Sequence, residues 1–253
     1  MNTVYDFAYG TWAVFLREML LLKNKLKKFG FVVYSLVSPL IFLTAFGFGF
    51  GSRISFDGVR YEYFLVQGIV CMTSMMNSYN LVMTSVSFGR LYTKSFQNII
   101  TSPVSALSVM TGLVMSGILR GVMASVVVMS AGFLLFDVFP FGFYSVVAIF
   151  FNLLFFSSLG VMIGLYLKDM EANAMIMNFF IMPMNFFSGT FYPVYNLPSL
   201  LNKLVYIFPL THTNIIIRAV NMDSSVIMSL ITLIVLTVAA FLCGVLMLNR
   251  YSE

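Results

Sequence analysis

The residues from Ala106 to Phe136 read ALSVMTGLVMSGILRGVMASVVVMSAGFLLF, an apolar run interrupted by a single charge, Arg120. A helix rises about 1.5 Å per residue, so a run of this length exceeds the roughly 30 Å hydrocarbon core of a bilayer. Strands of a membrane barrel alternate apolar and polar residues, and this run does not. The run therefore predicts a transmembrane helix.

The composition extends this prediction to the whole chain. Of its 253 residues, 60% are hydrophobic and 9% are charged, whereas roughly 25% of the residues in a soluble domain are charged. Further long apolar runs cover residues 31–51, 62–86, 143–167, 174–192 and 226–248. We therefore expect an all-α integral membrane protein with six transmembrane helices, and a membrane domain over residues 31–253.

Basic residues predict the orientation of these helices. Arg17 and four lysines, Lys23, Lys25, Lys27 and Lys28, precede the first expected span. Basic residues close to a span are retained in the cytoplasm, so the N-terminus is expected inside, and six spans return the C-terminus to the same side. These five bases account for most of the net charge of +5, and no nucleic-acid partner is expected.

Residues 1–30 have the pattern of an amphipathic helix. Apolar residues recur there at spacings of three and four, which places them on one helical face: Trp12, Phe15, Met19 and Leu22. Such a helix is typical of the membrane interface, and we expect lipid to be one of its partners. Two interpretations remain open, a helix that only floats on the membrane or a cytoplasmic collar that also touches a partner.

The polar residues exclude several kinds of chemistry. All nine acidic residues fall in predicted loops, tails or span ends, so the buried carboxylate relay of an ion-coupled carrier is not expected. The chain has no glycine-rich phosphate loop of the Walker type, so any ATP hydrolysis must occur on another polypeptide. The single histidine, His212, has no catalytic or metal-binding partners near it in sequence. We expect no catalytic residues, no metal and no cofactor on this chain.

Arg120 is the one charge inside an expected span. A lone charge there costs several kcal/mol unless it snorkels, pairs or lines a polar path. One interpretation is that Arg120 snorkels or bonds to backbone carbonyls inside the bundle. The other is that it provides a positive point on the path of an anionic substrate.

Residues 193–218 are too apolar for an ordinary loop, and Pro193, Pro198 and Pro209 interrupt any continuous helix. Non-helical backbone at membrane depth is tolerated only against protein or a cavity, so we expect two short re-entrant external helices. Neighbouring aromatic residues would form an outer gate over the path: Phe187, Phe191, Tyr192 and Tyr195. The alternative is that these helices only shield the bundle.

Three stretches together resemble the transmembrane permease subunits of type-2 ATP-binding cassette (ABC) exporters, the group of nodulation-factor, drug-resistance and polysaccharide permeases. The first runs from Pro39 to Gly51 and the second from Thr101 to Ser105. The third and most specific is Ser188-Gly189-Thr190-Phe191-Tyr192-Pro193 with the later residues Pro209, His212 and Arg218. The resemblance covers nearly the whole chain.

The resemblance implies a function and a set of partners. The chain would be a permease, paired as a homodimer in the bacterial cytoplasmic membrane, with two copies of a soluble ABC ATPase that bind ATP and Mg. Residues 90–105 would form the coupling segment. Its ATPase-contacting residues would be Arg90, Leu91, Tyr92, Lys94, Phe96, Gln97, Ile99, Ile100 and Thr101.

The cargo would be amphipathic or lipid-linked, and saccharide, lipid and drug all remain open. Two other functions are also open: an ion-coupled carrier or channel, and a membrane scaffold that transports nothing.

Overall fold

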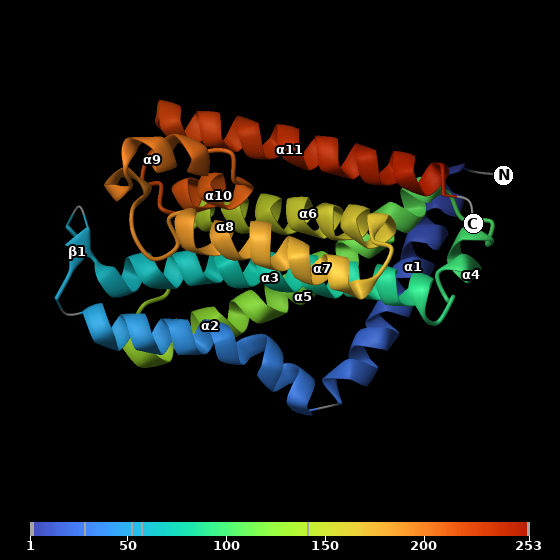
Figure 1. Ribbon diagram of the computed structural model, residues 1–253, viewed down its shortest axis with the longest axis horizontal. Coiled ribbons are helices and arrows are strands. Elements are labelled where there is room, and N and C mark those ends of the chain that lie inside the picture. The colour runs from blue at the N-terminus through green and yellow to red at the C-terminus, as the bar shows by residue number, and fades with distance from the viewer. Residues whose placement is uncertain (1–2, 28, 52, 57, 141, 252–253) are drawn as a thin grey trace.

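The computed structural model describes residues 3–27, 29–51, 53–56, 58–140 and 142–251. Most of the chain forms a bundle of long helices that run along one axis (Figure 1). The long helices are α1 (Thr3–Leu26), α2 (Phe29–Phe50), α3 (Tyr61–Leu91), α5 (Ala106–Phe136), α6 (Phe143–Tyr166) and α11 (Ser224–Asn249).

The remaining elements are shorter. One further helical stretch consists of α7 (Met170–Ile176), a π-helical turn over Met177–Ile181, and α8 (Met182–Phe187). Short elements make the connections: β1 (Ser55–Phe56), β2 (Val59–Arg60), α4 (Gln97–Ile100), a 3₁₀ turn over Val194–Asn196, α9 (Ser199–Val205) and α10 (Pro209–Ile217). Strands β1 and β2 pair antiparallel, with Ser55 opposite Arg60.

The expected class of all-α membrane protein is confirmed. Within the described residues, α5, α6 and α11 are each long and apolar enough to cross a membrane. A fourth crossing is added if α9 and α10, which meet at a bend of 91°, are counted as one broken span. Helices α2, α3 and α7–α8 occupy the other predicted spans, and the number of six spans stays a prediction.

Capping residues explain where the longest apolar helix begins and ends. At the start of α5, the Ser105 hydroxyl accepts a hydrogen bond of 3.1 Å from the Ser108 amide, which satisfies one free donor of the first turn. At its end, Asp137 takes the left-handed conformation with φ 55°, as residues that close a helix often do.

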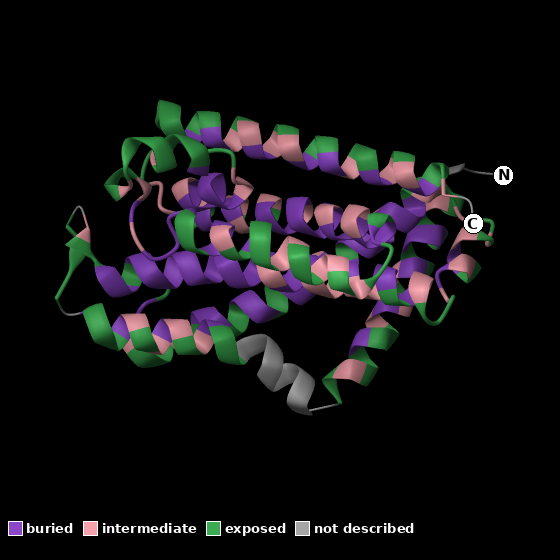
Figure 2. Ribbon diagram, viewed as in Figure 1, coloured by how far each residue is buried: buried purple, intermediate pink, exposed green. Residues whose placement is uncertain are grey.

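Helix α3 lies at the centre of the bundle, packs mainly against α6 and α5, and is buried over most of its length (Figure 2). Glycines allow the close approach of α6. A Cβ atom added at Gly160 would lie 2.8 Å from the Tyr79 carbonyl oxygen, and one at Gly164 would lie 3.1 Å from that of Met83. Small residues at such spacings let helix backbones meet in membrane proteins.

The two ends of the bundle differ. Both chain termini and α4 lie at one end, and the β1–β2 hairpin and α9 lie at the other (Figure 1). We call these the terminal end and the hairpin end. Helix α1 crosses the bundle near the terminal end.

Candidate functional site

Helix α1 packs against the first half of α5 through a narrow row of small residues. A Cβ atom added at Gly112 of α5 would lie 2.8 Å from the Thr11 carbonyl oxygen and 2.8 Å from the Val14 Cβ atom. The Ser108 hydroxyl also donates a hydrogen bond of 3.3 Å to the Phe7 carbonyl. Helix α5 therefore approaches the backbone of α1 closely, with no large side chain between them.

The apolar face predicted for α1 points largely away from the bundle. Trp12 is exposed, Phe15 and Met19 are half-buried, and only Leu22 is buried. Trp12 and Phe15 stack with ring centroids 5.5 Å apart. The contact of α1 with the membrane interface stays a prediction. The face of α1 that points into the bundle carries an acidic residue, Glu18.

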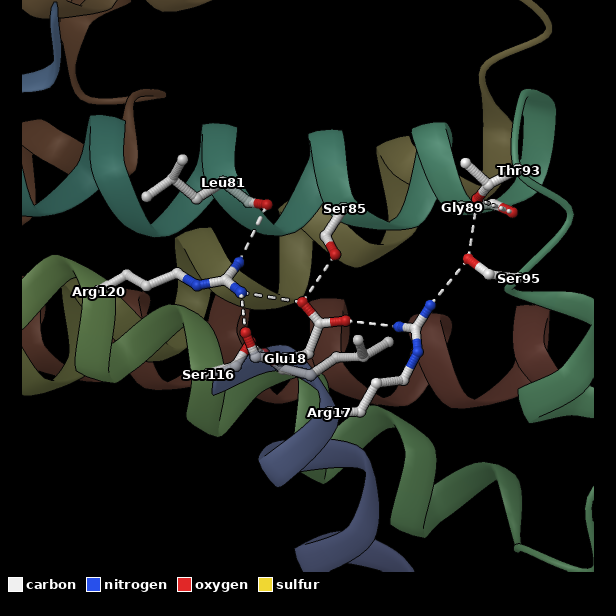
Figure 3. Close-up of polar contacts among 10 residues, drawn as sticks. Arg17, Glu18, Leu81, Ser85, Gly89, Thr93, Ser95, Ser116 and Arg120 are labelled. Atoms are coloured by element: carbon white, nitrogen blue, oxygen red, sulfur yellow. Dashed lines mark hydrogen bonds and ion pairs between the residues drawn. The ribbon is translucent and has the colours of Figure 1, made fainter. Parts of the chain in front are cut away.

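The Glu18 carboxylate lies in the centre of a buried polar network (Figure 3). One of its oxygens accepts a hydrogen bond of 2.9 Å from Arg120 of α5 and one of 2.7 Å from the Ser85 hydroxyl of α3. The other accepts a hydrogen bond of 2.7 Å from Arg17. Arg120 also donates to the Leu81 carbonyl at 3.1 Å. The carboxylate thus joins three helices.

Two expectations are corrected by this network. Glu18 was expected outside any buried region, but the residue is 0% exposed. One of the two interpretations of Arg120 placed it on the substrate path, but its guanidinium is buried against α1 and α3, where it bonds to backbone carbonyls as the other interpretation expects. A buried charge is tolerated when it is paired and hydrogen-bonded, so the position of Arg120 is explained by its partner.

The positive charge of this site extends along α1. Burial lowers the pKa of the Lys25 ammonium, and the Arg120 guanidinium lowers it further, against an opposing effect of Glu18. The single carboxylate of Glu18 thus faces two guanidinium groups and influences a third base.

Arg17 connects this network to the predicted coupling segment, residues 90–105 (Figure 3). Its guanidinium donates to Glu18 and also, at 2.9 Å, to the Ser95 hydroxyl. Ser95 in turn shares a hydrogen bond of 2.9 Å with Thr93. Lys94 between them has a positive φ of 51°, which makes a sharp turn of the backbone. The Arg17 side chain therefore ties residues 93–95 of the predicted coupling segment to α1.

The structure shows that two of the predicted ATPase contacts are not available at the surface. Phe96 is 1% exposed and Ile99 is 7% exposed, because both pack into the core of their own chain. Arg90, Leu91, Gln97 and Ile100 are half-buried. Of the predicted ATPase contacts, Tyr92, Lys94 and Thr101 are exposed.

The predicted external gate residues do not form one group. The Phe191 ring is buried in an aromatic cluster at the hairpin end, with centroids 4.8 Å from Phe46 and 5.5 Å from Phe186. Tyr192 is half-buried, whereas Phe187 and Tyr195 are exposed. Phe191 therefore acts as packing between α2 and α8 in this state.

The third stretch of the family resemblance is held together by a group of hydrogen bonds around Arg218 and His212. Arg218 donates a hydrogen bond of 2.7 Å to the Gly189 carbonyl and one of 3.2 Å to the Phe64 carbonyl of α3. Its guanidinium also lies 3.5 Å from the centroid of the Phe64 ring. Pro209 begins α10, and His212 contacts the Tyr206 carbonyl at 2.9 Å. These contacts hold residues 188–218 against α3.

A cavity of about 600 Å³ lies beside Arg218. Its walls include the aromatic residues Tyr63, Tyr144, Tyr195 and Tyr206 and the polar residues Gln67, Asn214 and Arg218. Tyr195 is the member of the predicted gate that lines it. Among the described residues, no three His, Cys, Asp or Glu side chains are grouped so that they could hold a metal ion.

Comparisons with known proteins agree with the resemblance seen in the sequence. The chain is 28% identical to the inner membrane transport permease YadH of Escherichia coli over 187 residues, which cover 71% of this chain and 72% of that protein. It is 25% identical to Nodulation protein J of Sinorhizobium fredii over 225 residues, or 87% and 86% of the two chains. A model of the family described as "ABC-2 type transporter" matches residues 9–222. The chain belongs to the ABC-2 type transporter family.

Proposed function

We propose that the chain is the permease subunit of an ATP-driven exporter and that a separate ATPase subunit supplies the energy. Family membership supports this proposal. The observation that carries it is the coupling segment, which presents Tyr92, Lys94 and Thr101 outward at the terminal end of the bundle. The same segment is bonded through Arg17 to the buried Glu18–Arg120 pair.

The proposed topology has six spans with both termini in the cytoplasm. The presence of both termini at one end of the bundle supports an even number of crossings. The bases that precede α2, Arg17 and Lys23 among them, favour the cytoplasm for that end. The coupling segment then lies on the side where ATP is available.

The proposed assembly contains two copies of this permease and two ATPase subunits, with ATP and Mg bound on the ATPases. The name of one relative, an inner membrane transport permease, supports transport across the bacterial cytoplasmic membrane. An amphipathic or lipid-linked cargo, whether saccharide, lipid or drug, fits an aromatic content of 17%, because aromatic rings stack on sugars and on planar drugs alike.

Movement would pass from the ATPases to the spans through named contacts. A displacement of the coupling segment moves Ser95, and the Arg17 side chain transmits it to Glu18. Glu18 is bonded to Arg120 of α5 and Ser85 of α3. A push on the coupling segment would therefore reach two central helices at once, because Glu18 bonds to both of them and is itself buried.

Copurification tests this function. The chain is purified from its native membrane in mild detergent, and soluble proteins present in stoichiometric amount are identified by mass spectrometry. We expect an ATPase with a phosphate-binding loop, and we expect the double variant Tyr92→Asp/Lys94→Asp to lose it. Tyr195→Asp, at an exposed residue outside the coupling segment, is the matched control and should retain it.

Two outcomes would contradict the proposal. If no ATPase copurifies in repeated preparations, an ion-coupled carrier or a scaffold becomes the better interpretation. If the ATPase is found but the double variant retains it, docking occurs elsewhere on the chain. Phe96→Asp is not a suitable probe, since it places a charge at a buried site and is expected to unfold the region.

A further inference from the structure

A groove of about 460 Å³ lies between α1 and α5. Its walls are apolar side chains, Met19, Leu22 and Leu26 from α1 and Leu119 and Met123 from α5. Two lysines of the α1 end, Lys23 and Lys27, complete the lining. The groove thus combines a hydrocarbon surface with two positive charges.

Helical spacing explains this arrangement. Met19 and Lys23 are four residues apart on one face of α1, and Lys27 follows just past the end of the helix, where its amide donates to the Lys23 carbonyl at 3.3 Å. Leu119 and Met123 have the same spacing on α5. Since α1 contacts α5 closely at Gly112, the next turns of the two helices form the facing walls of the groove.

Within the described part of the chain, neither lysine forms an ion pair. Among the residues that the structure describes, the ion pairs join Arg17 to Glu18, Arg60 to Glu62 and Arg120 to Glu18, and neither Lys23 nor Lys27 takes part. Like charges four residues apart on a helix repel each other. An anion placed between them would turn this repulsion into attraction.

We propose that this groove binds a phospholipid with an anionic headgroup, taken from the membrane leaflet that α1 faces. The phosphate lies between the ammonium groups of Lys23 and Lys27, and an acyl chain lies along Leu22, Leu119 and Met123. The positive charges of Lys23 and Lys27 favour an anion, and basic pockets between membrane helices favour anionic lipid headgroups. The apolar walls require an alkyl chain rather than a soluble anion, because only hydrocarbon gains by covering them.

The position of the groove gives the lipid a structural role. Leu119 directly precedes Arg120, and Leu22 lies one turn beyond Glu18 on α1. A lipid that fills the groove therefore packs next to the buried ion pair and holds α1 against α5. The proposal does not depend on the direction or the cargo of transport.

Native mass spectrometry of the detergent-purified protein tests the proposal. Phosphatidylglycerol and phosphatidylcholine with the same acyl chains are added separately, and glycerol phosphate is added as a headgroup without chains. We expect phosphatidylglycerol to bind about 30-fold more tightly than phosphatidylcholine, from two basic contacts. We also expect no retained glycerol phosphate.

Two variants and one control make the test specific. Lys23→Gln/Lys27→Gln should remove the preference for phosphatidylglycerol, and Met123→Trp should weaken retention of both lipids by filling the groove. Met123 is 43% exposed, so a larger side chain there leaves the core intact. Lys168→Gln/Lys203→Gln removes two exposed lysines outside the groove and should keep the preference of the unmodified protein.

Three results would refute the proposed lipid site. An equal preference in the unmodified protein and in Lys23→Gln/Lys27→Gln would refute the site. Retention of glycerol phosphate as strong as that of phosphatidylglycerol would refute a lipid occupant. A retained amphiphile from the native membrane that is displaced by neither phospholipid would assign the groove to the exported cargo and overturn the phospholipid proposal.

Discussion

The carboxylate of Glu18 and the guanidinium of Arg120 lie 2.9 Å apart, with side-chain exposures of 1% and 4%. The first residue belongs to a helix that crosses the bundle near its terminal end, and the second lies near the middle of α5. An ion pair removed from water in this way is strongly destabilised when one partner is lost, because the other charge stays buried. The pair therefore fixes α1 to the bundle.

Glu18→Gln should destabilise the purified permease by about 3–5 kcal/mol, the usual cost of breaking a buried pair. The amide retains the size of the side chain but leaves Arg120 without a counter-charge. Thermal unfolding in detergent, followed by tryptophan fluorescence of Trp12 and by circular dichroism, measures the loss. Trp12 lies on α1 itself, so its signal also reports whether this helix separates first.

The double variant Glu18→Met/Arg120→Met is the control for this prediction. It removes both charges and should be more stable than either single variant, since apolar residues of similar volume can replace a buried ion pair. If the double variant is as unstable as the sum of the two single variants, the pair has no coupling energy and the argument fails.

Arg17→Gln and Ser95→Ala should impair coupling with little effect on folding. The Arg17 side chain is 27% exposed, and a partly exposed ion pair contributes at most about 1 kcal/mol. We expect a nearly unchanged unfolding temperature and a lower ATPase activity of the purified permease–ATPase complex in lipid. The two substitutions act on one hydrogen bond, so the double variant should be no worse than the worse single variant.

Lys168→Gln, which changes an exposed base outside the network, is the matched control and should have normal ATPase activity. Additive losses in the double variant would mean that Arg17 and Ser95 act independently, which would contradict the proposed route of transmission.

The helices were predictable where apolar runs are long and their ends are capped. The expected span 106–136 coincides with α5 because Ser105 begins the helix and Asp137 ends it. The span 174–192 was less accurate, since the helical stretch begins at Met170 and ends at Phe187. Gly189 has φ 82°, so the chain leaves the helix before the apolar run ends.

The buried network could not be predicted in the same way. The distance of an acidic residue from an apolar run does not reveal its burial, and Glu18 lies before the first such run. A usable signal was present, because the lone charge of Arg120 requires a counter-charge and Gly10, Val14 and Glu18 share one face of α1. For Phe96 and Ile99, the four-residue helix α4 is too short for its periodicity to show which side faces the core.

Gly112→Val should displace α1 from α5. A Cβ atom at this position lies 2.8 Å from the Thr11 carbonyl oxygen, a backbone atom that cannot turn aside. Overpacking of this kind usually costs about 1–3 kcal/mol, and we expect a lower unfolding temperature. The Arg120 guanidinium would also lose its contact with Glu18, so a Glu18→Gln substitution should cost less in the Gly112→Val background.

Gly49→Val in α2 is the matched control, because a Cβ atom there has nothing within 4 Å. Both substitutions change glycine to the same residue within a helix, so their difference isolates the contact with α1. Equal unfolding temperatures for the two variants would show that α1 is not held closely at Gly112.

Arg218→Lys should loosen residues 188–218 although it keeps the positive charge. The guanidinium of Arg218 bonds the carbonyls of Gly189 and Phe64 with different nitrogens and covers the Phe64 ring at 3.5 Å. A lysine ammonium is a single point and cannot reproduce this fork. Each buried carbonyl left without a donor costs about 1–3 kcal/mol. We expect a lower unfolding temperature and faster proteolysis between Gly189 and Leu197, while Arg53→Lys at an exposed position should change neither. Unchanged protease resistance in Arg218→Lys would mean that charge alone holds this segment, because charge is the one property that the substitution conserves.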